Sequence, residues 1–186
     1  MSPGFRRLGE TVRFQGALIS LATARFAAPD GQEFERDVVH HPGAVSVVPV
    51  LDGPDGAHQV ILVRQYRAAV DAELLEVVAG KRDVAGEPPE ETAWRELAEE
   101  IGMVAGRLEL LAEFYNSPGF CDEHSFVFLG RDLVATEPEA HGIEEQYMTI
   151  EHVALTDVAR LIADREIVDA KTIIGLALAK EALGWA

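Results

Sequence analysis

The stretch "GKRDVAGEPPEETAWRELAEEIGM", residues 80–103, decides the fold because it joins a glycine-containing turn, two prolines and an acidic helix. The helix should begin at Pro88 or Pro89, since the φ of proline suits a first helical turn. It should end before Gly102, which suits the left-handed position that follows a helix. An apolar stripe is predicted from the spacing of Trp94, Leu97, Ala98 and Ile101.

Three glutamates, Glu96, Glu99 and Glu100, crowd the end of this helix. Positions i, i+3 and i+4 share a helix face, here predicted to lie opposite the apolar stripe, and like charges there destabilise a helix by about 0.2–0.5 kcal/mol per pair. The negative end of the helix dipole adds to that repulsion. A divalent cation such as Mg²⁺ or Mn²⁺ would reverse it, because hard cations take oxygen ligands. Arg95 can pair with Glu91 and Glu99 and orient them, and the alternative interpretation is a solvated acidic face.

The same stretch resembles the signature of the Nudix hydrolases, G-x5-E-x7-R-E-U-x-E-E-x-G-U, where U is a bulky aliphatic residue. One departure is that six residues separate Gly80 from Glu87. The flanks "VRQYRAAV" and "FYNSPGFCDE" resemble those of the ADP-ribose pyrophosphatases of the family, although Lys81 and Arg82 stand where that subgroup commonly has aliphatic residues. The signature positions are filled by Gly80, Glu87, Arg95, Glu96, Leu97, Glu99, Glu100, Gly102 and Met103.

The resemblance implies Mg²⁺-dependent hydrolysis of the diphosphate linkage of ADP-ribose or a related nucleoside diphosphate sugar. The products would be AMP, or another nucleoside monophosphate, and a sugar phosphate. Mg²⁺ is the expected cofactor, and Mn²⁺ a possible substitute. Two alternatives stay open: a Nudix-fold module that binds or senses a nucleotide sugar without cutting it, and an acidic interaction domain without ligand chemistry. The expected metal ligands are Glu96, Glu100, Glu99 and, by the resemblance, the backbone carbonyl of Ala79.

A catalytic base is expected on the segment "HGIEEQYMTIE", because something must take a proton from the attacking water. The resemblance places a catalytic glutamate on the corresponding loop of ADP-ribose pyrophosphatases. Glu145 is the preferred candidate and Glu144 the alternative. Two adjacent acids on a loop are also typical of a plain exposed surface. Arg95 joins the predicted catalytic group as the residue that orients the glutamates.

Substrate contacts are predicted on both flanks of the signature. Arg64 and Arg67 close the strand-like run "ILVRQYR", and a guanidinium suits bidentate contact with a diphosphate. A surface ion pair is the alternative interpretation for each arginine. The "SPGFCDE" segment is expected to form a wall on the ribose side of the substrate, with Ser117, Gly119 and Glu123.

The order of elements predicts an α+β fold: strand-like runs, the signature helix, more strands, and two terminal helices. Thr156 is the expected cap of the helix in residues 157–166. The resemblance implies a Nudix-type α/β/α sandwich of mixed sheets and helices over residues 43–186. Residues 1–42 form a predicted strand-rich N-terminal extension that serves dimerisation. We therefore expect a homodimer in which these strands help to wall the partner's pocket.

Composition bounds the partners. The chain has 186 residues, a formal net charge of -16 and a single cysteine, Cys121. Such a charge disfavours nucleic acid as a partner. No apolar run approaches the roughly 18 residues that a membrane span needs, so no membrane partner is expected. The lone cysteine fits a reducing compartment, and a cytoplasmic location is predicted.

Overall fold

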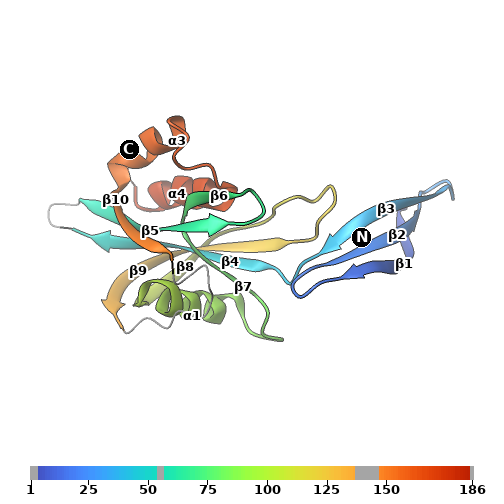
Figure 1. Cartoon of the computed structure of the whole chain (residues 1–186), viewed down its shortest axis with the longest axis horizontal. Helices are drawn as coiled ribbons and strands as arrows, with labels where there is room; N and C mark the ends of the chain where they lie inside the picture. The colour runs from blue at the N-terminus through green and yellow to red at the C-terminus, as the bar shows by residue number, and fades with distance from the viewer. Residues whose placement is uncertain (1–3, 54–56, 137–146, 185–186) are drawn as a thin grey trace. The chain divides into compact units, whose positions relative to one another are not determined.

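The structure, a computed structural model, describes residues 4–53, 57–136 and 147–184 (Figure 1). The chain divides into two compact units, one made of Met1–Gly43 with Phe114–His124 and the other of Ala44–Glu113 with Ser125–Ala186. The predicted N-terminal extension, residues 1–42, falls in the first unit together with the loop after β8. No helix in the described ranges is both long and apolar enough to cross a membrane.

The first unit is built on an antiparallel sheet of order β1-β2-β3. Its strands are β1 (Arg6–Gln15), β2 (Ser20–Ala27) and β3 (Glu33–His40). Phe26 of β2 lies opposite Phe34 of β3, and the two rings stack with centroids 5.4 Å apart. The backbone of Val39 binds the loop after β8, since its N–H donates to the carbonyl of Phe120 at 2.7 Å and its carbonyl accepts from Asp122 at 3.1 Å. Strand β3 therefore fixes that loop.

The second unit contains a mixed sheet of order β10-β5-β4-β9-β8, in which β4 runs parallel to β9 and antiparallel to β5. Strand β6 pairs with β5, whereas β7 pairs with β4, so the chain crosses from one strand to the next at Val77. The crossing brings β7 beside the signature helix. The strands are β4 (Ala44–Asp52), β5 (His58–Arg67), β6 (Ala72–Glu76), β7 (Val78–Lys81), β8 (Met103–Tyr115), β9 (His124–Ala135) and β10 (Thr149–Ala154).

Helices cover both faces of this sheet, with α1 (Pro89–Ile101) on one face and α3 (Val158–Ala163) and α4 (Ala170–Ala182) on the other (Figure 1). A 3-10 turn, η2 (Leu155–Asp157), leads into α3. Alternate residues of β4 serve the two layers: Val47 packs in one core cluster with Leu97 of α1. Gly175 lets α4 approach β4, since a Cβ there would lie 2.9 Å from Cγ2 of Val48. The predicted α+β sandwich is confirmed.

Helix α1 begins at Pro89 and ends at Ile101, and Gly102 follows it with a left-handed φ of 61°. Both predicted boundaries agree with the structure. The buried side of α1 is wider than the apolar stripe, because it also includes Glu96 and Glu100, each 9% exposed. The two acids point toward the strands rather than into open solvent, so the prediction of a glutamate face opposite the apolar stripe is wrong.

Candidate active site

Strand β7 and helix α1 bring Ala79 and Gly80 against the side chains of Glu96 and Glu100. Ala79 pairs with Ser46 of β4, and its N–H donates to Oε2 of Glu100 at 3.3 Å. The carboxyl group of Glu96 lies against Gly80, where an added Cβ would be 1.8 Å from Cδ of Glu96. A residue with any side chain at position 80 would occupy the place of that carboxylate. The signature glycine therefore makes the room in which Glu96 lies.

Arg95 neutralises the neighbouring acids in this structure. Its guanidinium lies 2.8 Å from Oε1 of Glu96, 2.9 Å from Oε2 of Glu99 and 3.6 Å from Oε2 of Glu87. Burial works to lower the pKa of Arg95, but the charges of Glu96 and Glu99 outweigh it and raise the pKa above its usual value. The predicted pairing with Glu99 is present. The predicted pairing with Glu91 is wrong within the described residues, since Glu87 and Glu96 hold the guanidinium instead.

Glu87 lies at the entry to the helix, where it shares Arg95 with Glu96 and Glu99. Its Oε2 accepts a hydrogen bond of 2.6 Å from the hydroxyl of Thr92. The side chain of Thr92 is fully buried and also reaches the carbonyl of Pro88 at 3.3 Å. Glu87 thus ties the loop from Gly86, whose φ is 81°, to the first turn of α1.

We call the place where Glu96 and Glu100 lie against Ala79 and Gly80 the glutamate corner. Its oxygen donors fit a hard divalent cation, because two carboxylates there meet backbone at a glycine, which has no side chain to keep a ligand away. Within residues 4–53, 57–136 and 147–184, however, no three His, Cys, Asp or Glu side chains converge closely enough to hold a metal ion. Two carboxylates of α1, those of Glu96 and Glu99, form ion pairs with Arg95 in this structure. The predicted bases Glu145 and Glu144 lie in residues 137–146, outside the described residues.

The structure places the two predicted arginines in separate ion pairs. Nε of Arg64 donates to Oε1 of Glu151 on β10 at 2.6 Å. Arg67 binds Glu76 through two hydrogen bonds, Nε to Oε1 at 2.9 Å and Nη2 to Oε2 at 2.7 Å. The hydrogen bond to Glu76 raises the pKa of Arg67, and the charge of Glu100 adds to that shift. Of the two arginines, Arg67 is therefore the one coupled to the glutamate corner.

Sequence reasoning missed a buried charged cluster beside this corner. It consists of Glu76, which is 1% exposed, with Arg67, Lys171 and Asp169 around it. The available signal was the run "DAKT" at residues 169–172, in which an N-cap aspartate precedes a lysine on the first helical turn. A lysine there is repelled by the positive end of the helix dipole, which predicts an acidic partner for it.

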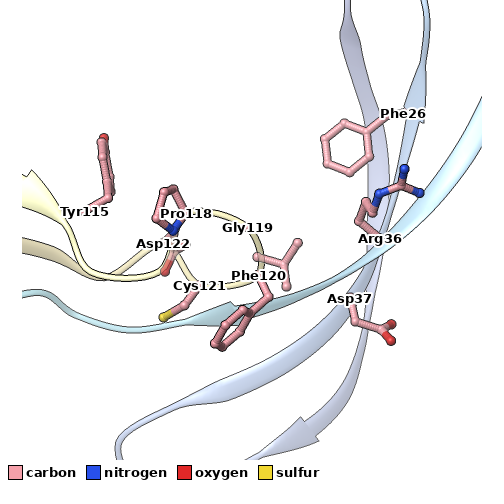
Figure 2. A pocket seen from close by; sticks show the side chains of 10 residues that line it. Phe26, Arg36, Asp37, Tyr115, Pro118, Gly119, Phe120, Cys121 and Asp122 are labelled. Carbon is pink, nitrogen blue, oxygen red and sulfur yellow. The ribbon is translucent and has the colours of Figure 1, made fainter.

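A second candidate region lies wholly in the first unit. A pocket of about 300 Å³ is bordered by strands β2 and β3 on one side and by the loop after β8 on the other, as Figure 2 shows. Phe26 and Arg36 come from the strands, and Tyr115, Pro118 and Phe120 from the loop side. Of the predicted substrate contacts, Gly119 lines this pocket.

The other two predicted contacts on this loop support its shape. The carbonyl of Ser117 accepts hydrogen bonds from the N–H groups of Phe120 at 3.1 Å and Cys121 at 2.9 Å. Oε1 of Glu123 lies 3.9 Å from Nδ1 of His41. The structure thus brings Ser117, Gly119 and Glu123 onto one loop, in the unit that does not contain the signature helix.

Comparisons with known proteins agree with this architecture. The ADP-ribose pyrophosphatase of Bacillus subtilis (strain 168) is 40% identical over 159 residues, which cover 86% of this chain and 83% of that protein. The ADP-ribose pyrophosphatase of Mycobacterium tuberculosis is 36% identical over 173 residues, covering 92% of this chain and 81% of its own. A solved structure described as an ADP compounds hydrolase has a TM-score of 0.82, covering 97% of this chain and 94% of its own. Its 22% identity supports the fold alone.

The family profile described as the NUDIX domain matches residues 40–171. That range includes the sheet of the second unit, the signature helix and the glycine segment against Glu96. The chain therefore belongs to the Nudix family.

Proposed function

We propose that this Nudix protein hydrolyses the diphosphate linkage of ADP-ribose, or of a related nucleoside diphosphate sugar, in a Mg²⁺-dependent reaction. The products are AMP, or another nucleoside monophosphate, and a sugar phosphate. The observation that carries the proposal is the packing of Glu96 against Gly80 with Glu100 bound to Ala79, because it assembles oxygen donors at a buried corner. The names and coverage of the two ADP-ribose pyrophosphatases support the choice of substrate.

Mg²⁺ is the proposed metal, with Mn²⁺ as a substitute, and the residues that would hold it are Glu96, Glu99, Glu100 and the carbonyl of Ala79. A bound divalent cation supplies charge neutralisation at phosphate oxygens and activates water. Arg95 forms ion pairs with both Glu96 and Glu99, and its positive charge offsets the repulsion between the two carboxylates. Glu145, or else Glu144, is the proposed base that accepts the proton of the attacking water.

Arg67 is the proposed diphosphate clamp. Its side chain is 39% exposed, and Glu76 holds one edge of the guanidinium through Nε and Nη2. A guanidinium oriented in this way binds phosphate oxygens without first having to be ordered. Arg64 was predicted to share this role, but its pairing with Glu151 favours a structural link between β5 and β10.

The pocket of the first unit is the proposed binding site for the nucleoside base, with Ser117, Gly119 and Glu123 shaping its loop. Its lining includes the rings of Phe26, Tyr115 and Phe120, and aromatic faces stack on any base. Arg36, which also lies over the ring of Phe34 at 4.8 Å, adds a cation to the lining.

A homodimer is proposed as well, with the N-terminal sheet as the contact surface. Every residue of β1 is exposed, and the strand carries apolar side chains such as Val12 at 53% and Phe14 at 60% exposure. An exposed apolar strand of this length invites pairing with another chain. Light scattering at micromolar concentration tests this: a 20.2 kDa species would contradict the dimer. The single Cys121 favours a reducing, cytoplasmic location.

Hydrolysis of a substrate panel tests the function. The panel contains ADP-ribose, ADP-glucose, GDP-mannose, NADH, diadenosine polyphosphates and 8-oxo nucleotides, each with Mg²⁺ and with excess chelator. We expect AMP and ribose 5-phosphate from ADP-ribose, with turnover that depends on Mg²⁺. Tight binding of ADP-ribose without turnover would instead favour a binding or sensing module. A thermal melt that Mg²⁺ leaves unchanged would contradict the metal site.

A further inference from the structure

The first turn of α4 binds the point where the chain crosses from β5 to β4. The hydroxyl of Thr172 accepts a 3.0 Å hydrogen bond from the N–H of Val77, and both residues are fully buried. Asp169 caps the helix by accepting from the N–H of Thr172 at 2.9 Å and from its hydroxyl at 2.6 Å. The crossing is thus fixed by a helix terminus two positions before Ala79, whose N–H binds Glu100.

Lys171, on the same turn, binds the acid that precedes the crossing. Its Nζ contacts Oε2 of Glu76 and lies 2.9 Å from Oδ1 of Asp169. The same Oε2 accepts from Nη2 of Arg67, while Oε1 accepts from Nε. A carboxylate that is 1% exposed requires paired charges, and here two cations balance two acids.

Arg67 is held along one edge only. Nε and Nη2 bind Glu76, and among the described residues Nη1 takes part in no hydrogen bond. The hydrogen bond to Glu76 is the largest cause of the raised pKa of Arg67, and the charges of Glu76 and Glu100 add to it. The orientation of the open edge therefore depends on where Glu76 is held.

We propose that Lys171 is a positioning residue for substrate binding: it fixes Glu76, and Glu76 in turn keeps the open edge of Arg67 directed to the diphosphate. This role rests on the proposed function. Without Lys171, Oε2 of Glu76 loses one of its two cations, and Asp169 loses its ion pair. The carboxylate of Glu76, which holds Arg67 through two hydrogen bonds, is then less constrained. Part of the free energy of substrate binding has to be used to order the guanidinium of Arg67.

Steady-state kinetics at saturating Mg²⁺ test this role in Lys171→Met and Lys171→Arg, with Lys180→Met on the exposed part of the same helix as the matched control. Lys171→Met should raise KM for ADP-ribose about tenfold and leave kcat within about twofold, because uniform ground-state and transition-state binding is lost. Lys171→Arg should restore most of the affinity, and Lys180→Met should match the wild type. A purely structural role would lower the fraction of folded enzyme, and thus apparent kcat, without changing KM. A folded Lys171→Met protein with wild-type KM overturns the proposal.

A second measurement needs no turnover. Hydrogen exchange at the Nε–H of Arg67 and the N–H of Val77, followed by NMR without substrate, should be faster in Lys171→Met than in the wild type or in Lys171→Arg. Unchanged exchange overturns the positioning role, and Lys171→Gln replaces the methionine variant if that does not fold. If the wild type cleaves nothing in the panel, the proposed function fails, and the exchange rates still decide whether Lys171 orders Arg67.

Discussion

The carboxyl group of Glu96 fills the space that a side chain on Gly80 would need, with only 1.8 Å between its Cδ and an ideal Cβ at position 80. The relationship gives the glycine of the signature a steric reason, since φ of Gly80 is not among the positive values of the chain. Position 80 has to be glycine because of its neighbour on α1, and not because of its backbone conformation.

Gly80→Ala should therefore separate stability from activity. The atom that clashes is the end of a flexible side chain, so Glu96 can rotate away at a small cost in folding free energy. The same rotation removes a proposed metal ligand, and we expect kcat to fall about 10²-fold. Thermal melting and kcat measured on one preparation check this. Gly130→Ala, which crowds only Cγ1 of Val47 at 3.1 Å, is the control and should keep its kcat.

Glu96→Gln and Glu100→Gln should each lower turnover by orders of magnitude while the fold persists. Both residues are 9% exposed beside Ala79 and Gly80, and an amide is a poorer ligand than a carboxylate for a hard cation. Glu91→Gln, on the exposed side of the same helix, should retain activity. Near-normal kcat at saturating Mg²⁺ in either buried variant would refute the ligand assignment.

How far the sequence predicts this protein differs between its helices. At α1 the boundaries follow from local chemistry, because Pro89 and Gly102 act on their own backbone. At the C-terminal end the expected cap Thr156 lies inside a 3-10 turn, and α3 begins after Asp157 without a side-chain cap. Leu155, just before Thr156, is 4% exposed and packs in the interior of the fold. The local sequence around Thr156 does not show this packing, so it does not predict where the helix begins.

The candidate site shows the same limit. The helical spacing of Glu96, Glu99 and Glu100 predicts that they gather, but it does not reveal which of them face the strands. Ion pairs between distant segments, such as Lys171 with Glu76, depend on the strand crossing at Val77, and sequence reasoning has no access to that topology. The different partners of the two predicted arginines, Glu151 for Arg64 and Glu76 for Arg67, likewise depend on which strands lie side by side.

His40 links β1 to the loop after β8, and its contribution to stability should depend on pH. Its Nδ1 lies 2.5 Å from Oδ2 of Asp122 and its Nε2 2.9 Å from Oε2 of Glu10. Both ring nitrogens can donate only when the imidazole is protonated. The hydrogen bond to Asp122, with that to Glu10, raises the pKa of His40. The stabilisation is therefore complete below the unfolded pKa of about 6.5 and is lost as pH rises through the folded value.

Glu10 and Asp122 set the lower end of the pH range in which His40 stabilises the fold. The hydrogen bond to His40 lowers the pKa of Glu10, and although burial opposes it, the contacts with His40 and His41 lower that of Asp122. Their contribution is lost as pH falls through those lowered values. The melting temperature of His40→Gln should thus lie furthest below the wild type between about pH 4.5 and 6.5 and approach it near pH 9. His152→Gln, at an exposed position of β10, is the control variant. A difference that grows toward high pH would contradict a charged His40.

Phe26→Ala tests the proposed base pocket in the first unit. Phe26 lines the pocket opposite Tyr115 and Phe120 and is itself stacked on Phe34 at 5.4 Å. Loss of one stacking surface typically costs about 1–3 kcal/mol per base, so KM for ADP-ribose should rise about tenfold with kcat nearly unchanged. Product inhibition separates the two halves of the substrate: AMP should inhibit the variant more weakly than the wild type, whereas ribose 5-phosphate should inhibit both equally. Val134→Ala, an exposed apolar truncation at 66% exposure on β9, is the control. Equal weakening of both products would place the defect outside base recognition, because only AMP carries a ring that could stack in this pocket.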